Sequence, residues 1–141
     1  MYTHTTQIRV RYGETDQMGY VYYGHYASYF EVARVEALRH LGMSYKELEE
    51  EGIMMPVLEN HSYYHHPAIY DDLLSIEVSI KNIPSVRIIF YYRIFNESGK
   101  MVHSGETKLA FMHAENKRPC RPSEKMIALL APFFEPGGSE V

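Results

Sequence analysis

Asp16 is the residue with the clearest chemical potential, because it lies in the turn-rich segment GETDQMG (residues 13–19), shortly before a predicted long helix. A helix N-terminus carries unpaired backbone N–H groups and a partial positive charge. A carboxylate beside such donors can act as a general base or a nucleophile while the N–H groups stabilise a developing oxyanion. Loop aspartates also commonly cap a helix or interact with its dipole, so residue types alone leave both interpretations open.

Aromatic residues crowd around Asp16 in a chain that has thirteen Tyr, six Phe and no Trp. Such a run can shape an apolar pocket for an acyl or aryl group. Ordinary packing is the alternative, and we favour it for Tyr26 and Phe30, which lie on the apolar stripe of the predicted helix. The run comprises Tyr20, Tyr22, Tyr23, Tyr26, Tyr29 and Phe30.

Other kinds of catalytic site find little support. The eight histidines include no pair at i, i+4 spacing in a predicted helix, and no cysteine motif could complete a metal site. We expect His65 and His66 on successive strand positions, pointing to opposite faces. No Gly-x-Ser-x-Gly motif is present, and Cys120 is expected to be a surface thiol. The cations Lys117, Arg118 and Arg121 can bind phosphates at a pocket mouth or form a solvated basic loop.

Size and composition predict one globular domain over residues 1–135, followed by a flexible tail over residues 136–141. Fourteen basic and eighteen acidic residues give a net charge of −4, which argues weakly against nucleic-acid binding. A single cysteine fits a reducing compartment. The polar N-terminus is unlike a signal peptide and no apolar run is long enough to cross a bilayer, so we expect a cytoplasmic protein.

The elements that must position Asp16 follow from the periodicity. Alternating residues predict strands, and a 3.6-residue apolar period over residues 24–41 predicts the long helix, ended by Gly42. A short helix capped by Ser44 and a last helix capped by Ser123 are also expected. The fold class is α+β, an antiparallel sheet packed on one helix. The predicted strands are 5–12, a region within 53–68, 74–81, 86–95 and 100–113; the other helices are 45–51 and 123–134.

The segment that begins at Gln7-Ile8 and contains TDQMGYVYYGHY (residues 15–26) and FEVAR (residues 30–34) closely resembles the hot-dog-fold acyl-CoA thioesterases of the 4-hydroxybenzoyl-CoA thioesterase and YbgC-like group. Its signature is an Asp, two spacers, a Gly and paired aromatic residues before a helix. Tyr64, Pro67-Ala68 and the pattern at residues 70–72 extend the resemblance.

The resemblance implies a hot-dog fold, in which a five-stranded antiparallel sheet wraps around the long central helix, with an additional C-terminal helix. It also implies a homodimer or homotetramer with acyl-CoA at the subunit interface. The catalytic carboxylate corresponds to Asp16, and the backbone N–H of Tyr23 corresponds to the group that polarises the thioester carbonyl. Coenzyme A is then part of the substrate, and no metal or other cofactor is expected.

Further residues are implied with less specific roles. Tyr22, Gly24, His25 and Tyr64 are expected to bind substrate, although His25 occupies a position that is often Asn or Ser. The candidates for contacts to the coenzyme A phosphates are Arg87, Lys117, Arg118 and Arg121.

The predicted reaction is hydrolysis of an acyl thioester to the free acid and coenzyme A, with acyl carrier protein left open as an alternative carrier. One competing hypothesis is a hot-dog hydratase or dehydratase, but Asp16 and His25 are nine positions apart and the motifs Gly-Asp-x-Asn-Pro and His-x-Phe-Pro-Gly are missing. The other is a non-catalytic domain that binds acyl thioesters.

Overall fold

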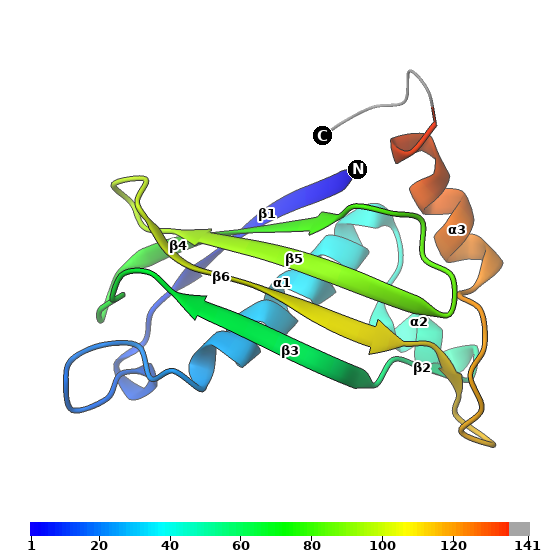
Figure 1. The fold of residues 1–141 in the computed structure, drawn as a ribbon, viewed down its shortest axis with the longest axis horizontal. Helices are drawn as coiled ribbons and strands as arrows, with labels where there is room; N and C mark the ends of the chain where they lie inside the picture. The colour runs from blue at the N-terminus through cyan, green and yellow to red at the C-terminus, as the bar shows by residue number, and fades with distance from the viewer. Residues whose placement is uncertain (136–141) are drawn as a thin grey trace.

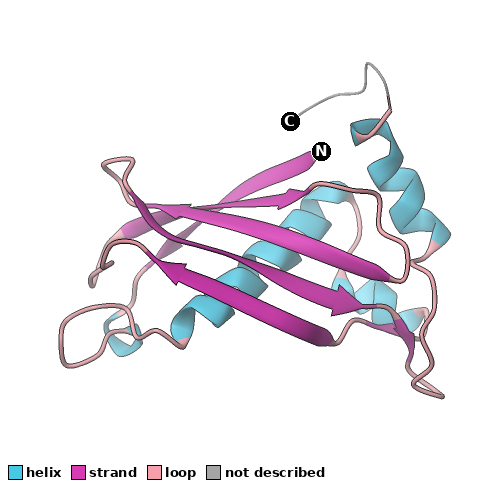
Figure 2. Ribbon diagram, viewed as in Figure 1, coloured by secondary structure: helices cyan, strands magenta, loops and turns pink. Residues whose placement is uncertain are grey.

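A long helix, α1 (His25–Leu41), lies across one face of a five-stranded antiparallel sheet in the computed structural model, which describes residues 1–135 (Figures 1 and 2). This arrangement confirms the predicted α+β hot-dog architecture. The predicted tail, residues 136–141, lies outside the described residues. No helix within residues 1–135 has the length and apolar character needed to cross a membrane.

The sheet has the strand order β1-β4-β5-β6-β3, so β5 is central, as its apolar sequence predicts. Every neighbouring pair is antiparallel, and β3 and β1 form the two edges. A separate two-stranded ribbon joins β2 to β7. The strands are β1 (Tyr2–Arg9), β2 (Ile53–Met54), β3 (Val57–Tyr64), β4 (Leu73–Ile80), β5 (Arg87–Phe95), β6 (Met101–Ala110) and β7 (Met112–His113).

The shorter helical elements lie outside the sheet. They are the 3₁₀ turn η1 (Tyr12–Glu14), α2 (Tyr45–Glu50), α3 (Glu124–Leu130) and the 3₁₀ turn η2 (Ala131–Phe133). Ser44 and Ser123 accept hydrogen bonds from the backbone N–H groups of Glu47 and Met126, so both predicted N-caps are confirmed. Gly42 ends α1 with φ of 114°, a left-handed conformation that glycine adopts without a steric penalty.

Three predicted strand boundaries are wrong. The first strand spans Tyr2–Arg9 rather than residues 5–12, because residues 12–14 turn into η1. The region 53–68 divides at Pro56, which has no N–H to donate to a ladder, into β2 and β3. The last predicted strand likewise divides into β6 and β7.

His65 and His66 also depart from the prediction. They follow the end of β3, and both donate their backbone N–H groups to the carbonyl of Val102 at 3.0 and 3.1 Å. They therefore do not continue the ladder on opposite faces of a strand.

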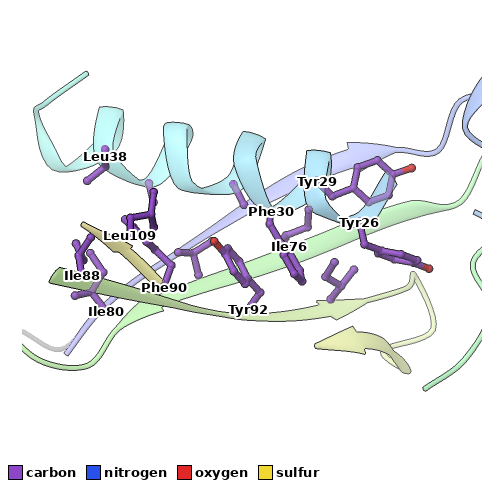
Figure 3. Close-up of a cluster of buried hydrophobic side chains, with 14 of the residues drawn as sticks. Tyr26, Tyr29, Phe30, Leu38, Ile76, Ile80, Ile88, Phe90, Tyr92 and Leu109 are labelled. Atoms are coloured by element: carbon purple, nitrogen blue, oxygen red, sulfur yellow. The ribbon is translucent and has the colours of Figure 1, made fainter. Parts of the chain in front are cut away.

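The core lies between α1 and the concave face of the sheet, where Phe30 stacks on Tyr92 with ring centroids 3.9 Å apart (Figure 3). Ala33 and Ala37 are fully buried, and these small residues let the helix approach closely. Gly105 on β6 is required for the same reason, because a Cβ there would lie 2.8 Å from the Phe30 ring and collide with the carbonyl of His61. Burial of a phenylalanine side chain contributes about 1.5–3 kcal/mol, so this contact anchors the helix.

The buried face of α1 is wider than predicted. Tyr26, Phe30, Ala33 and Ala37 are buried as expected, but the same helix also buries Tyr29, Arg34 and Leu38. Leu41 is only partly buried. The face is broader because elements outside the sheet also cover α1: Tyr29 contacts Glu14 in η1, and Arg34 contacts Tyr45 in α2 as well as Tyr92 in β5.

Candidate active site

Residues 14–22 form a small hairpin that leads into α1, seen in blue beside the start of the helix (Figure 1). The backbone N–H of Tyr22 donates to the Glu14 carbonyl at 2.8 Å, and the N–H of Asp16 donates to the Tyr20 carbonyl at 2.8 Å. Val21 donates its N–H to the Ala68 carbonyl at 2.8 Å, which joins the hairpin to the segment after β3. The loop that carries Asp16 is therefore an ordered turn with a fixed connection to the sheet.

The Asp16 carboxylate is held by its own loop. Its Oδ1 accepts the backbone N–H groups of Met18 at 2.9 Å and Tyr20 at 3.3 Å. Its Oδ2 accepts no hydrogen bond from residues 1–135, which leaves one oxygen of a half-buried carboxylate available. Asp16 does not cap α1, because Gly24 occupies the N-cap position and no side chain caps it.

A cavity of about 300 Å³ opens beside Asp16. Its walls combine the end of the hairpin, the first turn of α1 and the end of β3. Most lining side chains are aromatic or aliphatic, so the cavity suits an apolar group with few polar contacts. The lining residues are Asp16, Met18, Tyr20, Val21, Tyr23, Tyr26, Tyr64, His65, His66 and Pro67.

Just before α1, one backbone N–H of a cavity-lining residue has no acceptor in the described chain. The backbone N–H of His25 donates to the Tyr22 carbonyl at 2.9 Å, but the N–H of Tyr23 finds no acceptor among residues 1–135. The Tyr64 hydroxyl donates to the Tyr23 carbonyl at 3.4 Å, which connects β3 to the residue before the helix. An N–H group without an acceptor at a helix N-terminus can bind a carbonyl oxygen that gains negative charge.

Tyr26, which lines the cavity, stacks on the ring of His103 behind it. Tyr26 lies parallel to His103 with centroids 3.7 Å apart, and Tyr64 meets His103 edge-on at 4.7 Å. Burial lowers the pKa of His103 to about 4, so its imidazole is neutral near pH 7. Its Nε2 lies 3.0 Å from the Ser62 hydroxyl, and its buried Nδ1 has no partner within the described chain.

The structure brings together some predicted site residues and separates others. Asp16, Tyr23 and Tyr64 line the same cavity. Tyr22, Gly24 and His25 lie at the start of α1 but do not line it, and the His25 ring packs edge-on to Tyr22 at 6.0 Å. Tyr26, predicted as packing, is buried and also contributes to the cavity wall.

The four candidate phosphate-binding cations lie elsewhere in the chain. Arg87 begins β5, Lys117 and Arg118 follow β7, and Arg121 lines a separate groove beside α3. Figure 1 shows the loop after β7 at the opposite end of the sheet from the Asp16 hairpin. Within residues 1–135 of one chain, none of these cations reaches the Asp16 cavity.

The sequence did not point to His65 and His66, which line the cavity, or to His103 and Ser62, which lie behind it. His103 shares the inward face of β6 with Thr107 and Leu109, so a polar residue at a core position was the available signal. His65 lies 2.8 Å from the Ser104 hydroxyl through its Nε2. In the part of the chain that the structure describes, no group of three or more His, Cys, Asp or Glu residues could hold a metal ion.

The five-stranded sheet wrapped over one long helix, with the Asp16 hairpin leading into that helix, defines a hot-dog fold. Residues 10–130 match the sequence model of the Thioesterase-like superfamily, and the chain belongs to this family. The predicted resemblance is therefore confirmed.

Named relatives and a solved structure agree with this membership. The chain is 29% identical over 121 residues to the acyl-CoA thioester hydrolase YbgC of Escherichia coli O6:H1, covering 86% of this chain and 90% of the relative. It is 31% identical over 113 residues to the acyl-CoA thioesterase YbgC of Haemophilus influenzae, and the match covers 79% of this chain and 82% of that relative. The DHNA-CoA thioesterase from Staphylococcus aureus superposes with a TM-score of 0.82 at 35% identity, covering 86% of this chain and 81% of that one.

Proposed function

We propose that this protein hydrolyses acyl-CoA thioesters to the free acid and coenzyme A in the cavity beside Asp16. The observation that carries the proposal is the joint presence of Asp16 and Tyr23 in one largely apolar cavity. Among the described residues, neither the Oδ2 of Asp16 nor the N–H of Tyr23 has a hydrogen-bond partner, so the two can supply what a thioester carbonyl needs, activation of the attacking group and stabilisation of the oxyanion.

The chemistry has two possible routes through Asp16. As a general base, Oδ2 takes a proton from water, whose oxygen attacks the carbonyl carbon. As a nucleophile, Oδ2 attacks the carbonyl itself and forms an anhydride that water then hydrolyses. In both routes the C–S bond breaks, coenzyme A leaves as the thiolate and takes up a proton. One well-placed donor such as the Tyr23 N–H lowers the barrier by about 2.7–4 kcal/mol.

The surroundings of Asp16 favour a group that is mostly apolar. Tyr20, Tyr26 and Tyr64 supply flat walls for an acyl group, and the hairpin that carries Asp16 supplies Met18. We propose that Tyr22, Gly24 and His25 act indirectly, by setting the path of the chain into α1. A Cβ at Gly24 would lie 2.9 Å from the Tyr22 ring, so glycine allows the two to pack.

We propose that the working unit is at least a homodimer, with a cytoplasmic location and no cofactor beyond the coenzyme A of the substrate. Support for the dimer comes from β3, an edge strand whose residues are exposed except for Ser62. An exposed edge strand offers unpaired backbone groups to a second copy. A partner would also bring Arg87, Lys117, Arg118 or Arg121 toward the phosphates that one chain does not reach. A monomeric mass by sedimentation at working concentration would contradict the dimer.

The test is a panel of acyl-CoA thioesters assayed by release of free thiol. Asp16→Asn keeps an oxygen that accepts the Met18 and Tyr20 N–H groups, so the loop should stay in place. We expect kcat to fall by about 10²- to 10⁴-fold, the usual contribution of a general base. Asp71→Asn is the matched control, because Asp71 is an exposed loop aspartate outside the cavity lining.

Unchanged turnover in Asp16→Asn would contradict the assigned role of this residue. A wild-type protein that binds acyl-CoA but hydrolyses no thioester in the panel would favour a non-catalytic binding domain instead. Loss of ultraviolet absorbance of crotonyl-CoA without release of thiol would favour a hydratase.

A further inference from the structure

Glu14 is a buried carboxylate outside the Asp16 cavity. Only 8% of its surface is exposed, and the other buried charged side chain among residues 1–135 is Arg34. Burying a carboxylate is costly unless several hydrogen bonds satisfy it. The contacts of Glu14 therefore indicate what its burial achieves.

The carboxylate joins the hairpin to α1. Its Oε1 accepts the backbone N–H of Arg11 at 2.8 Å and the hydroxyl of Tyr29 at 3.0 Å. Its Oε2 accepts a guanidinium N–H of Arg11 at 3.2 Å. Tyr29 lies in the second turn of α1 and is itself 2% exposed, so this is a buried contact between two separate elements.

These partners keep Glu14 ionised. Burial acts to raise its pKa, but the Arg11 N–H, the Tyr29 hydroxyl and the Arg11 guanidinium together outweigh burial and hold the pKa of Glu14 below its ordinary value. Burial, followed by the hydrogen bond to Glu14, raises the pKa of Tyr29, so the phenol stays protonated as a donor. The phenol therefore donates to an ionised carboxylate near pH 7, and hydrogen bonds to a charged acceptor are generally stronger than neutral ones.

The backbone of Glu14 makes a second connection at the same place. Its carbonyl accepts the N–H of Tyr22, next to the proposed oxyanion donor Tyr23, while Asp16 is two residues further along the hairpin. Glu14 thus touches both strands of the hairpin and, through Tyr29, the helix behind them. Glu14 therefore lies at a junction between α1 and both strands of the hairpin that carries Asp16.

We propose that Glu14 and Tyr29 are positioning residues for thioester hydrolysis. Their hydrogen bond holds the hairpin against α1, so that the Asp16 carboxylate and the Tyr23 N–H can act on the same thioester carbonyl group. This inference rests on the proposed function. Neither residue lines the cavity, so their loss should leave the binding of the acyl group largely unchanged. A displacement of about 1 Å at a reacting group can lower a rate by about 10²-fold, and a loosened hairpin samples such displacements.

The deciding experiment compares two tyrosine variants. Tyr29→Phe removes only the hydroxyl that binds Glu14, and we expect kcat to fall about tenfold with KM changed by less than about twofold. Tyr2→Phe is the matched control, because the Tyr2 hydroxyl is also buried and donates to α1, at the Ala37 carbonyl, at 2.7 Å. Both variants lose one buried hydrogen bond between α1 and another element, but only the bond of Tyr29 leads to the hairpin.

Variants of Glu14 provide a second, independent measurement. Glu14→Ala removes all side-chain contacts and should lower kcat at least as much as Tyr29→Phe. Glu14→Gln keeps an acceptor of the same length and should recover part of the lost kcat. The double variant Glu14→Ala/Tyr29→Phe should be no slower than Glu14→Ala, since the two residues act through one bond.

The outcomes separate the two proposals. Wild-type kcat in Tyr29→Phe, or an equal loss of kcat in Tyr2→Phe, would overturn the positioning role while thioesterase activity stands. If the wild-type protein hydrolyses no thioester, the proposed function itself fails. If Glu14→Ala does not fold, the pair of tyrosine variants still decides the question.

Discussion

Two regions of the molecule bury opposite charges against the same helix. Near the start of α1, Glu14 is held by Tyr29 and by Arg11. In the second half of α1, the Arg34 guanidinium donates to the hydroxyl of Tyr92 on β5 at 3.0 Å and to that of Tyr45 on α2 at 3.3 Å. Both charges are satisfied by phenol groups, yet the surroundings of the two regions differ.

The difference lies in what each charge connects. Glu14 connects α1 to a hairpin whose tip carries Asp16 and opens onto a cavity. Arg34 connects α1 to β5 and α2, and neither of these elements contributes a residue to that cavity. A buried charge in the first region positions reactive groups, whereas a buried charge in the second region maintains packing. The two regions should therefore respond oppositely when stability and activity are measured separately.

Removing Arg34 should give the largest change in stability. Arg34→Ala deletes two hydrogen bonds from a charged donor, each worth about 1.5–3 kcal/mol, and leaves the buried Tyr92 hydroxyl without this donor. We expect the free energy of unfolding to fall by about 4 kcal/mol in urea titrations, with kcat of the folded protein within about twofold of wild type. Arg34→Met is the control, because its unbranched side chain retains most of the packing without the charge.

A loss of kcat in Arg34→Ala that matches the loss in Glu14→Ala would remove the distinction between the regions. The distinction would also be lost if a substitution at Glu14 unfolded the protein while Arg34→Ala left it stable.

The response to acid should also differ between the two regions. The pKa of His103, behind the cavity, is lowered by burial from its ordinary 6.5 to about 4, so the unfolded chain binds a proton more readily than the folded chain. This contribution to stability is complete above about pH 6.5 and is lost as the pH falls toward 4, by roughly 3 kcal/mol in all. The Arg34 guanidinium stays charged over this range and contributes no such dependence.

Denaturant titrations of wild type and His103→Gln at pH 7.5, 5.5 and 4.5 test this prediction. The wild-type protein should lose stability more steeply than the variant, which has no imidazole at this position. Parallel pH profiles for the two proteins would show that His103 does not carry the effect.

Much of the fold was predictable because it depends on local patterns. The alternation in β4 and the apolar period of α1 are visible in short windows, and so are the caps at Gly42 and Ser123. Local signals also located Asp16, and the resemblance supplied the fold and the class of reaction. These features require no knowledge of which segments meet in space.

The features that the sequence did not predict depend on contacts between residues far apart in the chain, which no short stretch of sequence contains. Glu14 is fifteen residues from Tyr29, and Arg34 is fifty-eight residues from Tyr92, so neither buried charge could be recognised as satisfied. His103 comes to lie behind the cavity, against Tyr26 and Tyr64, only through the pairing of β6 with β3. The cations after β7 were grouped with the site by charge, although the length of the sheet separates them from Asp16.

Two glycines, one in the Asp16 turn and one at the end of α1, allow a closely matched comparison with small expected effects. Gly19 closes the Asp16 turn with φ of 83°, and Gly42 ends α1 with φ of 114°. A Cβ would meet nothing within 4 Å at Gly19 and only the Leu129 side chain, at 3.5 Å, at Gly42, so the cost of alanine is mainly one of backbone conformation. That cost is about 1 kcal/mol at each site.

Thermal unfolding of Gly19→Ala and Gly42→Ala should therefore show similar small decreases in stability. Only Gly19→Ala should lower kcat, by roughly fivefold, because the Gly19 N–H donates to the Asp16 carbonyl and the turn orients the carboxylate. Equal kcat values in the two variants would mean that the hairpin tolerates distortion without moving Asp16. The requirement for a fixed hairpin, on which the role of Glu14 also depends, would then be lost.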